Sequence, residues 1–288
     1  MKTMKSLINP QKTVLIPSAH DALSARMIET AGFEAMGIGG AALAATQMAM
    51  PDVGLQSFGE YRDALARTLQ GSSLPAMVDG ENGFGDVKAI TRTVQSFETL
   101  GVAGISFEDL IFPPSLTSPP AVVETAEMVA KLEAALAARS NPETFIVGRT
   151  DAAGILGLDE ALNRARRYEE IGVDAVLLTG VQDHESLKKV RDQISVPIIA
   201  LVVENGPWVT ATPEELTAMG YEFALYPSTL MMGALTGYRD ALTAIRNGST
   251  TLPEGSVSHQ EMGEIVRRND WVELETKFSI ALETAETK

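Results

Sequence analysis

Short apolar segments alternate with amphipathic segments along the chain. Four apolar segments come after a glycine that is typical of a helix end, namely Gly32, Gly101, Gly172 and Gly220. Four more lie between them, over residues 12–21, 73–81, 143–151 and 195–204. Apolar strands of this kind, each followed by a helix, indicate a parallel sheet covered by helices. Eight of them predict an α/β fold, a closed (β/α)8 barrel of the TIM type.

An open, doubly wound parallel sheet is the alternative architecture. We favour the closed barrel because the chain has no glycine-rich phosphate fingerprint opening a first helix, and because the strand number suits closure. The predicted domains are the barrel over residues 1–247 and, over 248–288, a C-terminal linker followed by two additional amphipathic helices.

Composition narrows the class of protein. The net charge of −15 argues against nucleic acid and anionic membranes as partners, although a local pocket can still bind a small anion. No apolar run approaches the roughly 20 residues of a membrane span, and the first twelve residues lack the apolar stretch of a signal peptide. Zero cysteines rule out disulfides and thiolate chemistry. We therefore expect a cytoplasmic protein.

Polar residues gather at the predicted carboxyl ends of the strands, where barrel enzymes place their active sites. The residues expected to meet there are Asp79, Glu81, Glu108, Asp109, Arg149, Asp151 and Glu204. Crowded carboxylates need a cation, and oxygen ligands favour Mg²⁺, with Mn²⁺ as an alternative. Such ions are commonly held through one or two carboxylates, with water and substrate oxygens completing the shell.

Each of these residues also has a structural interpretation. Single acids at strand ends, such as Asp21, Asp109 and Asp183, are often helix caps or loop charges. Arg149 ends an apolar strand and must find an anion there, which a neighbouring acid could supply in place of a substrate.

Three segments together carry a family resemblance: MVDGENGFGD (77–86), FEDLIFPPSLTS (107–118) and VGRTDA (147–152). In this order and spacing they resemble the isocitrate lyase and phosphoenolpyruvate mutase superfamily, and the likeness runs from residue 18 to residue 235. The resemblance implies a barrel with Mg²⁺ held mostly through water. It also implies an α-keto acid substrate and a homotetramer, a dimer of dimers, in which neighbours exchange a C-terminal helix.

The resemblance also implies roles for individual residues. Asp79, Glu81 and Glu108 match the acids around the metal, and Asp52 matches an acid beside metal and substrate. The remaining matches concern the substrate: the backbone N–H groups of Gly40 and Ala41 for a carboxylate, Arg149 for the keto oxygen, and Ser228 as a polar residue on the last strand. Arg149, Asp52 and Ser228 are the expected catalytic residues. Glu204, one of the acids at the strand ends, is expected to bind the substrate. Glu81 replaces the usual aspartate, which shifts the metal geometry by one methylene.

The loop after the fourth strand distinguishes the activities of this superfamily. Its lyases carry Lys-Lys/Arg-Cys-Gly-His there, and the cysteine protonates the leaving enolate, whereas this chain has FPPSLTS at 112–118. Pro114, Ser115 and Leu116 stand where the phosphoryl-handling relatives carry a Lys-Thr-Asn-like motif. An apolar loop instead resembles the oxaloacetate decarboxylase branch, in which the departing CO₂ needs neither group.

We therefore expect a Mg²⁺-dependent carboxy-lyase that acts on oxaloacetate or a similar α-keto diacid through an enolate. Three different functions stay open. One is a carbon–carbon lyase or a hydrolase for a 2-keto or 2-hydroxy diacid, methylisocitrate lyase-like, that uses Ser115, Thr117 or Ser118. The second is a P–C bond enzyme acting on phosphonopyruvate or carboxyphosphonoenolpyruvate. The third is a barrel that binds α-keto acids without turnover.

Overall fold

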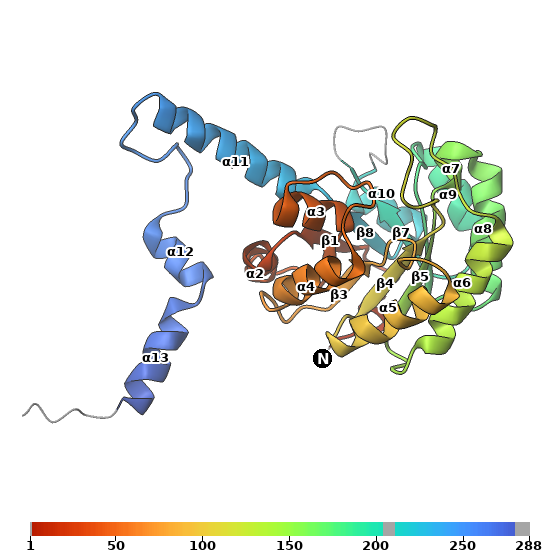
Figure 1. The fold of residues 1–288 in the computed structure, drawn as a ribbon, viewed down its shortest axis with the longest axis horizontal. Coiled ribbons are helices and arrows are strands. Elements are labelled where there is room, and N and C mark those ends of the chain that lie inside the picture. Colours follow the sequence, from red (N-terminus) through yellow and green to blue (C-terminus); the bar gives the residue numbers. More distant parts are fainter. Residues whose placement is uncertain (1, 204–210, 280–288) are drawn as a thin grey trace, which may run out of the picture. The chain divides into compact units, whose positions relative to one another are not determined.

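The computed structural model describes residues 2–203 and 211–279. The chain divides into two compact units, Met1–Leu235 and Thr236–Lys288 (Figure 1). The division falls inside one continuous helix, ahead of the boundary expected from the linker composition. The glycine and serine residues of that linker therefore mark the end of a helix.

The first unit contains a closed barrel of parallel strands. Within the described residues these strands are Val14–Ala19 (β1), Met36–Ile38 (β2), Ala76–Asp79 (β3), Gly104–Glu108 (β4), Phe145–Thr150 (β5), Ala175–Leu178 (β6), Ile198–Leu201 (β7) and Phe223–Tyr226 (β8). Each strand pairs with the next along the chain, and β8 pairs with β1 in the register Val14↔Phe223. The predicted (β/α)8 barrel is confirmed, and the open sheet is excluded because the β1–β8 pairing closes the ring.

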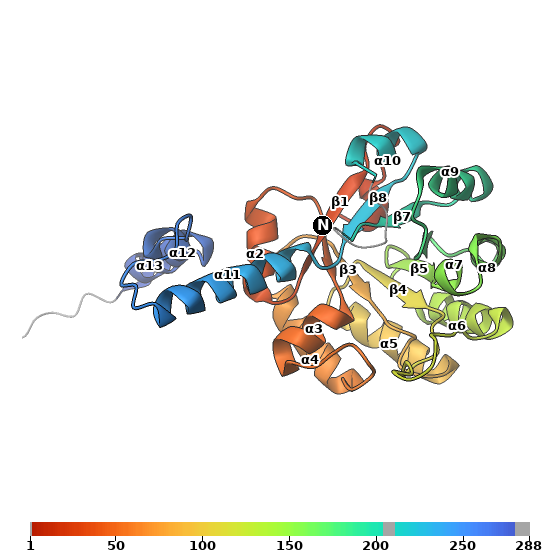
Figure 2. The same cartoon turned by 90° about the horizontal axis from the view of Figure 1, so that it is seen from above.

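Helices surround this ring of strands (Figure 2). Those that lie wholly in the first unit are Met4–Leu7 (α1), Ala22–Thr30 (α2), Gly40–Met48 (α3), Phe58–Leu69 (α4), Val87–Thr99 (α5), Thr125–Ala138 (α6), Ala152–Ile155 (α7), Leu158–Glu170 (α8), His184–Gln193 (α9) and Pro213–Met219 (α10). Asp21 caps α2 by accepting a hydrogen bond from the Ser24 N–H at 2.7 Å, and Asp183 caps α9 through the Ser186 N–H at 2.8 Å. These two acids are helix caps, as their isolated positions in the sequence suggest.

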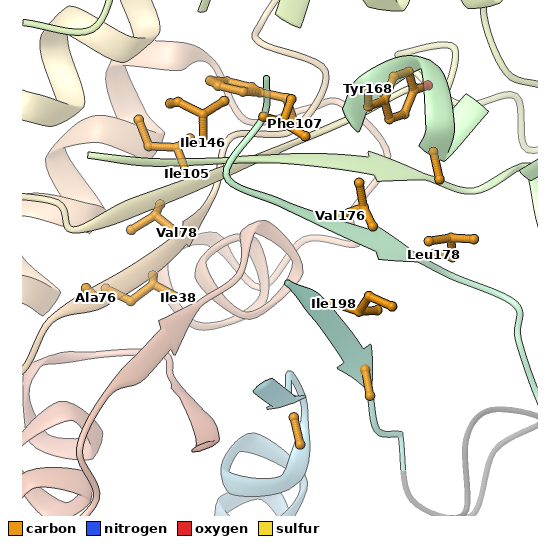
Figure 3. Packing of buried hydrophobic residues seen from close by; sticks show 14 of the residues in the cluster. Ile38, Ala76, Val78, Ile105, Phe107, Ile146, Tyr168, Val176, Leu178 and Ile198 are labelled. Atoms are coloured by element: carbon orange, nitrogen blue, oxygen red, sulfur yellow. The ribbon is translucent and has the colours of Figure 1, made fainter. Parts of the chain in front are cut away.

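Apolar side chains form two layers, one on each side of the sheet. The outer layer lies between strands and helices, and Figure 3 shows part of it, with side chains from β2 to β7 and Tyr168 from α8. The inner layer fills the barrel and includes Phe145 and Phe223, together with Met4 and Leu7 of α1. Because successive strand residues point to opposite faces, strands buried on both faces are almost continuously apolar.

The second unit contains the remainder of α11 (Thr229–Arg246), α12 (His259–Ile265) and α13 (Arg268–Phe278). The exposed fractions of Trp271 and Phe278 are 68% and 67%, which leaves a large apolar area on α13 uncovered. The exchange of this unit between subunits stays a prediction. In the parts of the chain that the structure describes, every helix is too short or too polar to cross a membrane.

Candidate active site

A cavity of about 230 Å³ lies where the strands end. Asp52, Asp79 and Arg149 line it, together with the first turn of α3. Asp79 is the last residue of β3, and Arg149 lies near the end of β5, so the barrel itself brings these two side chains together. This is the end of the barrel at which enzymes of this fold carry their chemistry.

Arg149 is the charged centre of the cavity. Its Nε and Nη2 lie 3.0 Å from the two carboxylate oxygens of Asp151, a forked arrangement that fixes the plane of the guanidinium. Its Nη2 lies 2.8 Å from Glu108 Oε2, and its Nη1 lies 3.5 Å from Asp79 Oδ2. Burial alone would lower the pKa of Arg149, but the acids Asp151, Glu108 and Asp79 raise it above its usual value.

The loop after β3 is shaped by its own backbone hydrogen bonds. Asp79 Oδ1 accepts from the Glu81 N–H at 3.0 Å, and the Glu81 carbonyl accepts from the Glu108 N–H at 2.9 Å. Glu81 adopts a left-handed conformation with φ of 51°, and Gly83 follows with φ of 82°. Left-handed conformations are costly for residues other than glycine, so surrounding contacts must hold Glu81 in place.

The acids of the site carry more negative charge than Arg149 can balance. Burial, repulsion by Asp79 and repulsion by Asp52 raise the pKa of Glu81 well above its usual value. Burial and neighbouring acids likewise raise the pKa of Glu108 to about 8, against an attraction by Arg149. The pKa values of Asp79 and Asp52 are also raised, in both cases mainly by burial. A cation would relieve this repulsion, so the donor chemistry fits a bound metal ion.

The arrangement of these acids restricts the kind of metal ion that the site suits. Over residues 2–203 and 211–279, no group of three or more histidine, aspartate or glutamate side chains is arranged to hold a metal ion. Asp79, Glu81 and Glu108 therefore do not form a ready set of three direct ligands. A hard cation that takes one or two carboxylates and completes its shell with water and substrate oxygens suits this arrangement.

Glu81 packs directly against Gly40 at the start of α3. A Cβ atom added to Gly40 would lie 1.6 Å from Glu81 Oε1 and 3.3 Å from Tyr61 Cε2. The Tyr61 hydroxyl donates a hydrogen bond to the Asp79 carbonyl, so this ring is itself fixed. The absence of a side chain at residue 40 is therefore what makes room for the longer acid at residue 81.

The first turn of α3 supplies the anion-binding part of the cavity. Gly39 is the N-cap, so Gly40 and Ala41 are the first two helical residues, and both line the cavity. The N–H groups in the first turn of an α-helix have no partner inside the helix and favour negative charge. This geometry suits the predicted contact with a substrate carboxylate.

The structure gives a different result for each of three further residues that were predicted to belong to the site. Asp52 lines the cavity beside Asp79. Ser228 lies just beyond β8, and its carbonyl accepts from the Met232 N–H, but the cavity wall at this place is formed by the preceding Pro227. Glu204 lies outside the residues that the structure describes.

The loop at 110–122 is closed at its base by an antiparallel bridge between Leu110 and Val122. Pro113 packs against Gly54, where an added Cβ would lie 2.5 Å from Pro113 Cβ. Ser115 Oγ accepts hydrogen bonds from the N–H groups of Thr117 and Ser118 at 3.2 and 3.0 Å, which organises the turn.

The loop has a further feature at Leu116. Its side chain has 77% of its surface exposed. In this structure Pro113 packs inward and Leu116 does not.

The sequence left Asp109 open between the group of acids at the strand ends and a cap or loop charge, and the cap or loop interpretation is wrong. Asp109 is fully buried and accepts hydrogen bonds from Thr150, Arg164, Tyr168 and the Asp151 N–H. An acid directly after an apolar strand was the one signal in the sequence. Its partners lie on another strand and on α8, at separations that no local pattern reveals.

A closed parallel barrel with an arginine and crowded acids at its strand ends, beside a helix N-terminus, defines a barrel enzyme for small anionic substrates. The chain belongs to the isocitrate lyase and phosphoenolpyruvate mutase superfamily, because the family model described as phosphoenolpyruvate phosphomutase matches residues 4–246. The resemblance noted in the sequence motifs is thereby confirmed, and with it the prediction of an enzyme.

Alignments with known relatives cover most of the chain. The 2,3-dimethylmalate lyase of Eubacterium barkeri is 34% identical over 250 residues, 86% of each chain. An oxaloacetate decarboxylase of Bradyrhizobium sp. is 30% identical over 275 residues, 91% of this chain and 92% of its own. These relatives are carbon–carbon lyases by name.

Solved structures share the fold closely. An oxaloacetate acetylhydrolase in complex with the inhibitor 3,3-difluorooxalacetate superposes with a TM-score of 0.88 at 26% identity, covering 96% of this chain and 95% of its own. A phosphonopyruvate hydrolase in complex with oxalate and Mg²⁺ has the same fold, with a TM-score of 0.85 at 23% identity over 96% of this chain and 97% of its own.

Proposed function

We propose that this protein is a Mg²⁺-dependent decarboxylase that converts oxaloacetate, or a similar α-keto diacid, to pyruvate or its homologue and CO₂. One observation carries the proposal. Arg149, Asp79 and the first turn of α3 face a single cavity of about 230 Å³, which holds an arginine and helix N–H groups for an anion and acids for a cation. The oxaloacetate decarboxylase relatives support the choice of substrate.

In this mechanism the N–H groups of Gly40 and Ala41 bind a substrate carboxylate, and Arg149 faces the C2 oxygen. The C3–C4 bond breaks, its electron pair forms the enolate of pyruvate, and CO₂ leaves; a proton then returns to C3. Arg149 stabilises the negative charge that develops on the C2 oxygen, which is the kind of interaction that contributes most to such reactions. Bound Mg²⁺ would supply Lewis acidity at the same oxygen.

Asp79 is the residue that we assign to direct contact with the metal, with Glu81, Glu108 and Asp52 acting through water. The choice of Asp79 over Glu108 rests on the distances: Glu108 is ion-paired with Arg149 at 2.8 Å, whereas Asp79 approaches it only at 3.5 Å. Mn²⁺ is an alternative ion for the same oxygen donors. Glu204 and Ser228 keep their predicted parts in substrate binding as proposals.

The loop at 112–118 favours decarboxylation over the other reactions of the superfamily. It contains no cysteine, lysine or histidine, so it offers no acid to a departing enolate and no group to handle a phosphoryl anion. Decarboxylation needs neither, because CO₂ leaves as a neutral molecule. We also propose a cytoplasmic homotetramer, on the basis of the cysteine-free composition and the exposed apolar face of α13.

The test measures pyruvate from oxaloacetate and Mg²⁺ with lactate dehydrogenase as the coupling enzyme. Divalent ions decarboxylate oxaloacetate slowly by themselves, so Arg149→Ala protein at equal concentration is the control. We expect rapid pyruvate formation by the unaltered protein that stops in excess chelator. Equal rates with the two proteins would refute the proposal.

The products and substrates also separate decarboxylation from the related reactions. Oxalate and acetate formed from oxaloacetate would indicate hydrolysis. Turnover of 2,3-dimethylmalate would indicate a lyase for 2-hydroxy diacids, and turnover of phosphonopyruvate would indicate a P–C bond enzyme. Binding of oxaloacetate without any product would indicate a non-catalytic barrel.

A further inference from the structure

Asp109 is a buried carboxylate that the proposed mechanism does not use. Its Oδ2 accepts hydrogen bonds from Thr150 Oγ1 at 2.7 Å, Arg164 Nη1 at 3.0 Å and the Tyr168 hydroxyl at 3.1 Å. Its Oδ1 accepts from the Asp151 N–H at 2.9 Å. A buried carboxylate with four donors is fully satisfied, and such a network holds its members in one arrangement.

One arm of this network leads to Arg149. The Asp151 carboxylate accepts two hydrogen bonds from the Arg149 guanidinium, and the Asp151 N–H donates to the Asp109 carboxylate. Thr179 Oγ1 donates to Asp151 Oδ1 at 2.5 Å, and the Thr179 N–H donates to the Thr150 carbonyl at 3.0 Å. Asp151 is therefore held at both its main chain and its side chain, and together with Glu108 it positions the guanidinium of Arg149, whose Nε–H donates to Asp151.

The other arm leads to the loop at 110–122. Arg164 lies on α8 with 4% of its surface exposed, and its Nη1 donates both to Asp109 and to the Val123 carbonyl, the latter at 2.8 Å. The Val123 N–H donates to the Asp109 carbonyl at 2.8 Å. Val123 follows directly on the bridge between Leu110 and Val122 that closes the loop. Asp109 therefore contacts both the base of the loop and the Asp151 main chain that supports Arg149.

We propose that Asp109, Arg164 and Thr179 are positioning residues: they fix the guanidinium of Arg149 through Asp151 and tie it to the base of the loop at 110–122. The inference rests on the proposed function in one respect, which is that Arg149 meets the substrate. A buried ion pair adds little net stability compared with apolar packing. The buried ion pair between Asp109 and Arg164 is therefore better explained by positioning than by stability alone.

The first experiment observes Arg149 without any substrate. In protein labelled with ¹⁵N-arginine, Arg149→Ala identifies the Nε–H signal of Arg149, and its hydrogen exchange is measured in Thr179→Val, Asp109→Asn and Tyr221→Phe. Tyr221→Phe is the matched control, because it removes one buried hydroxyl whose hydrogen bond, to the Leu187 carbonyl at 2.9 Å, lies outside the Asp109 network.

We expect exchange to be about 10-fold faster in Thr179→Val, the scale of one lost hydrogen bond, and unchanged within about 2-fold in Tyr221→Phe, whose lost hydrogen bond does not touch Asp109 or Asp151. Asp109→Asn should accelerate exchange at least as much; if that variant does not fold, Thr179→Val decides the question alone. Equal exchange in Thr179→Val and in the unaltered protein would overturn the inference.

The second experiment is a double-mutant cycle on turnover. Thr179→Val should lower kcat about 10-fold in the unaltered protein but less than about 2-fold in Arg149→Ala, because the residue acts through Arg149. Thr179→Ser, which keeps the hydroxyl, should restore kcat. A full effect of Thr179→Val in the Arg149→Ala background would show a merely structural role. If the unaltered protein turns over no α-keto diacid, the proposed function fails, and the exchange measurement still tests the positioning.

Discussion

The contact between Gly40 and Glu81 makes Gly40→Ala an informative substitution. The new Cβ would lie 1.6 Å from Glu81 Oε1 and 2.9 Å from Glu81 Cδ, so the carboxylate must move. Gly40 is a helical residue without a left-handed φ, and alanine there is favoured by roughly 0.5–1 kcal/mol. Overpacking costs about 1–3 kcal/mol where atoms cannot yield, but Oε1 is the end of a flexible side chain. We therefore expect a small change in stability.

Activity should respond much more strongly than stability. A displacement of about 1 Å in a catalytic group can cost about 10²-fold in rate, and Gly40→Ala displaces an acid of the metal loop. Shortening residue 81 by one carbon–carbon bond, about 1.5 Å, would draw the carboxylate back and lengthen the 1.6 Å approach to about 3.1 Å at most, a tight contact that a small shift of the shorter side chain relieves. The double variant Gly40→Ala/Glu81→Asp should therefore regain most of the activity that Gly40→Ala loses.

The assay compares kcat/KM for oxaloacetate with Mg²⁺, and Tm, across the unaltered protein, both single variants and the double variant. Gly59→Ala is the matched control, because a Cβ added in the first turn of α4 meets no atom within 4 Å and lies outside the cavity lining. Gly40→Ala retains its backbone N–H, so the substrate contact itself is kept. Full activity of Gly40→Ala, or a double variant as inactive as Gly40→Ala beside an active Glu81→Asp, would refute the reasoning.

Four other outcomes are expected. Arg149→Ala should lower kcat/KM by about 10²-fold or more in the pyruvate assay, as removal of a charge stabiliser does, and activity close to the unaltered value would exclude that role. Burial, together with nearby acids, raises the pKa of Glu108 from 4.5 to about 8. Its ionisation therefore opposes folding, and the free energy of unfolding of metal-free protein should fall as the pH rises through this window. Mg²⁺ should flatten that fall, as urea titrations at each pH can check. Ser115→Ala should retain most decarboxylase activity, since Ser115 Oγ accepts from two N–H groups of its own turn; a collapse of turnover in folded protein would favour a lyase or hydrolase. Light scattering should give a homotetramer, because the exposed faces of Trp271 and Phe278 need cover, and a monomer at micromolar concentration would contradict this.

The sequence predicted those parts of the molecule that depend on local patterns. Strands buried on both faces are continuously apolar, so the barrel could be recognised from eight such segments. Asp79 and Arg149 could be placed because each lies at or near the end of an apolar strand. A neighbouring acid was the partner suggested for Arg149, but the fork with Asp151 could not be read from the strand period, because Asp151 lies one residue beyond β5 as the N-cap of α7.

Contacts between distant segments could not be predicted in this way. Arg164 and Tyr168 are four residues apart and share one face of α8, but an arginine on an amphipathic helix is typical of a solvent-facing position. Only the packing of α8 over β5 and β6 brings them to Asp109. The fit of Glu81 against Gly40 likewise joins the loop after β3 to the first turn of α3, and no periodicity in the sequence encodes the distance between them.

The unequal distances around Arg149 indicate how one site can accept both a metal and an anion. The Asp151 fork and the Glu108 pair hold Nε and Nη2 at 3.0 Å or less, whereas Nη1 reaches Asp79 only at 3.5 Å. Nη1 therefore gives up the weakest of these contacts when it donates to a substrate oxygen instead. For the same reason, Asp79 can move away from Arg149 at a smaller energetic cost than Asp151 or Glu108. A cation that draws Asp79 away frees Nη1 for the substrate. Metal and substrate should consequently bind with positive coupling, and Asp79→Asn, which weakens both the ion pair and the metal contact, should remove that coupling in titrations of oxalate with and without Mg²⁺. Equal oxalate affinity in the presence and absence of Mg²⁺ in the unaltered protein would show that the two sites act independently.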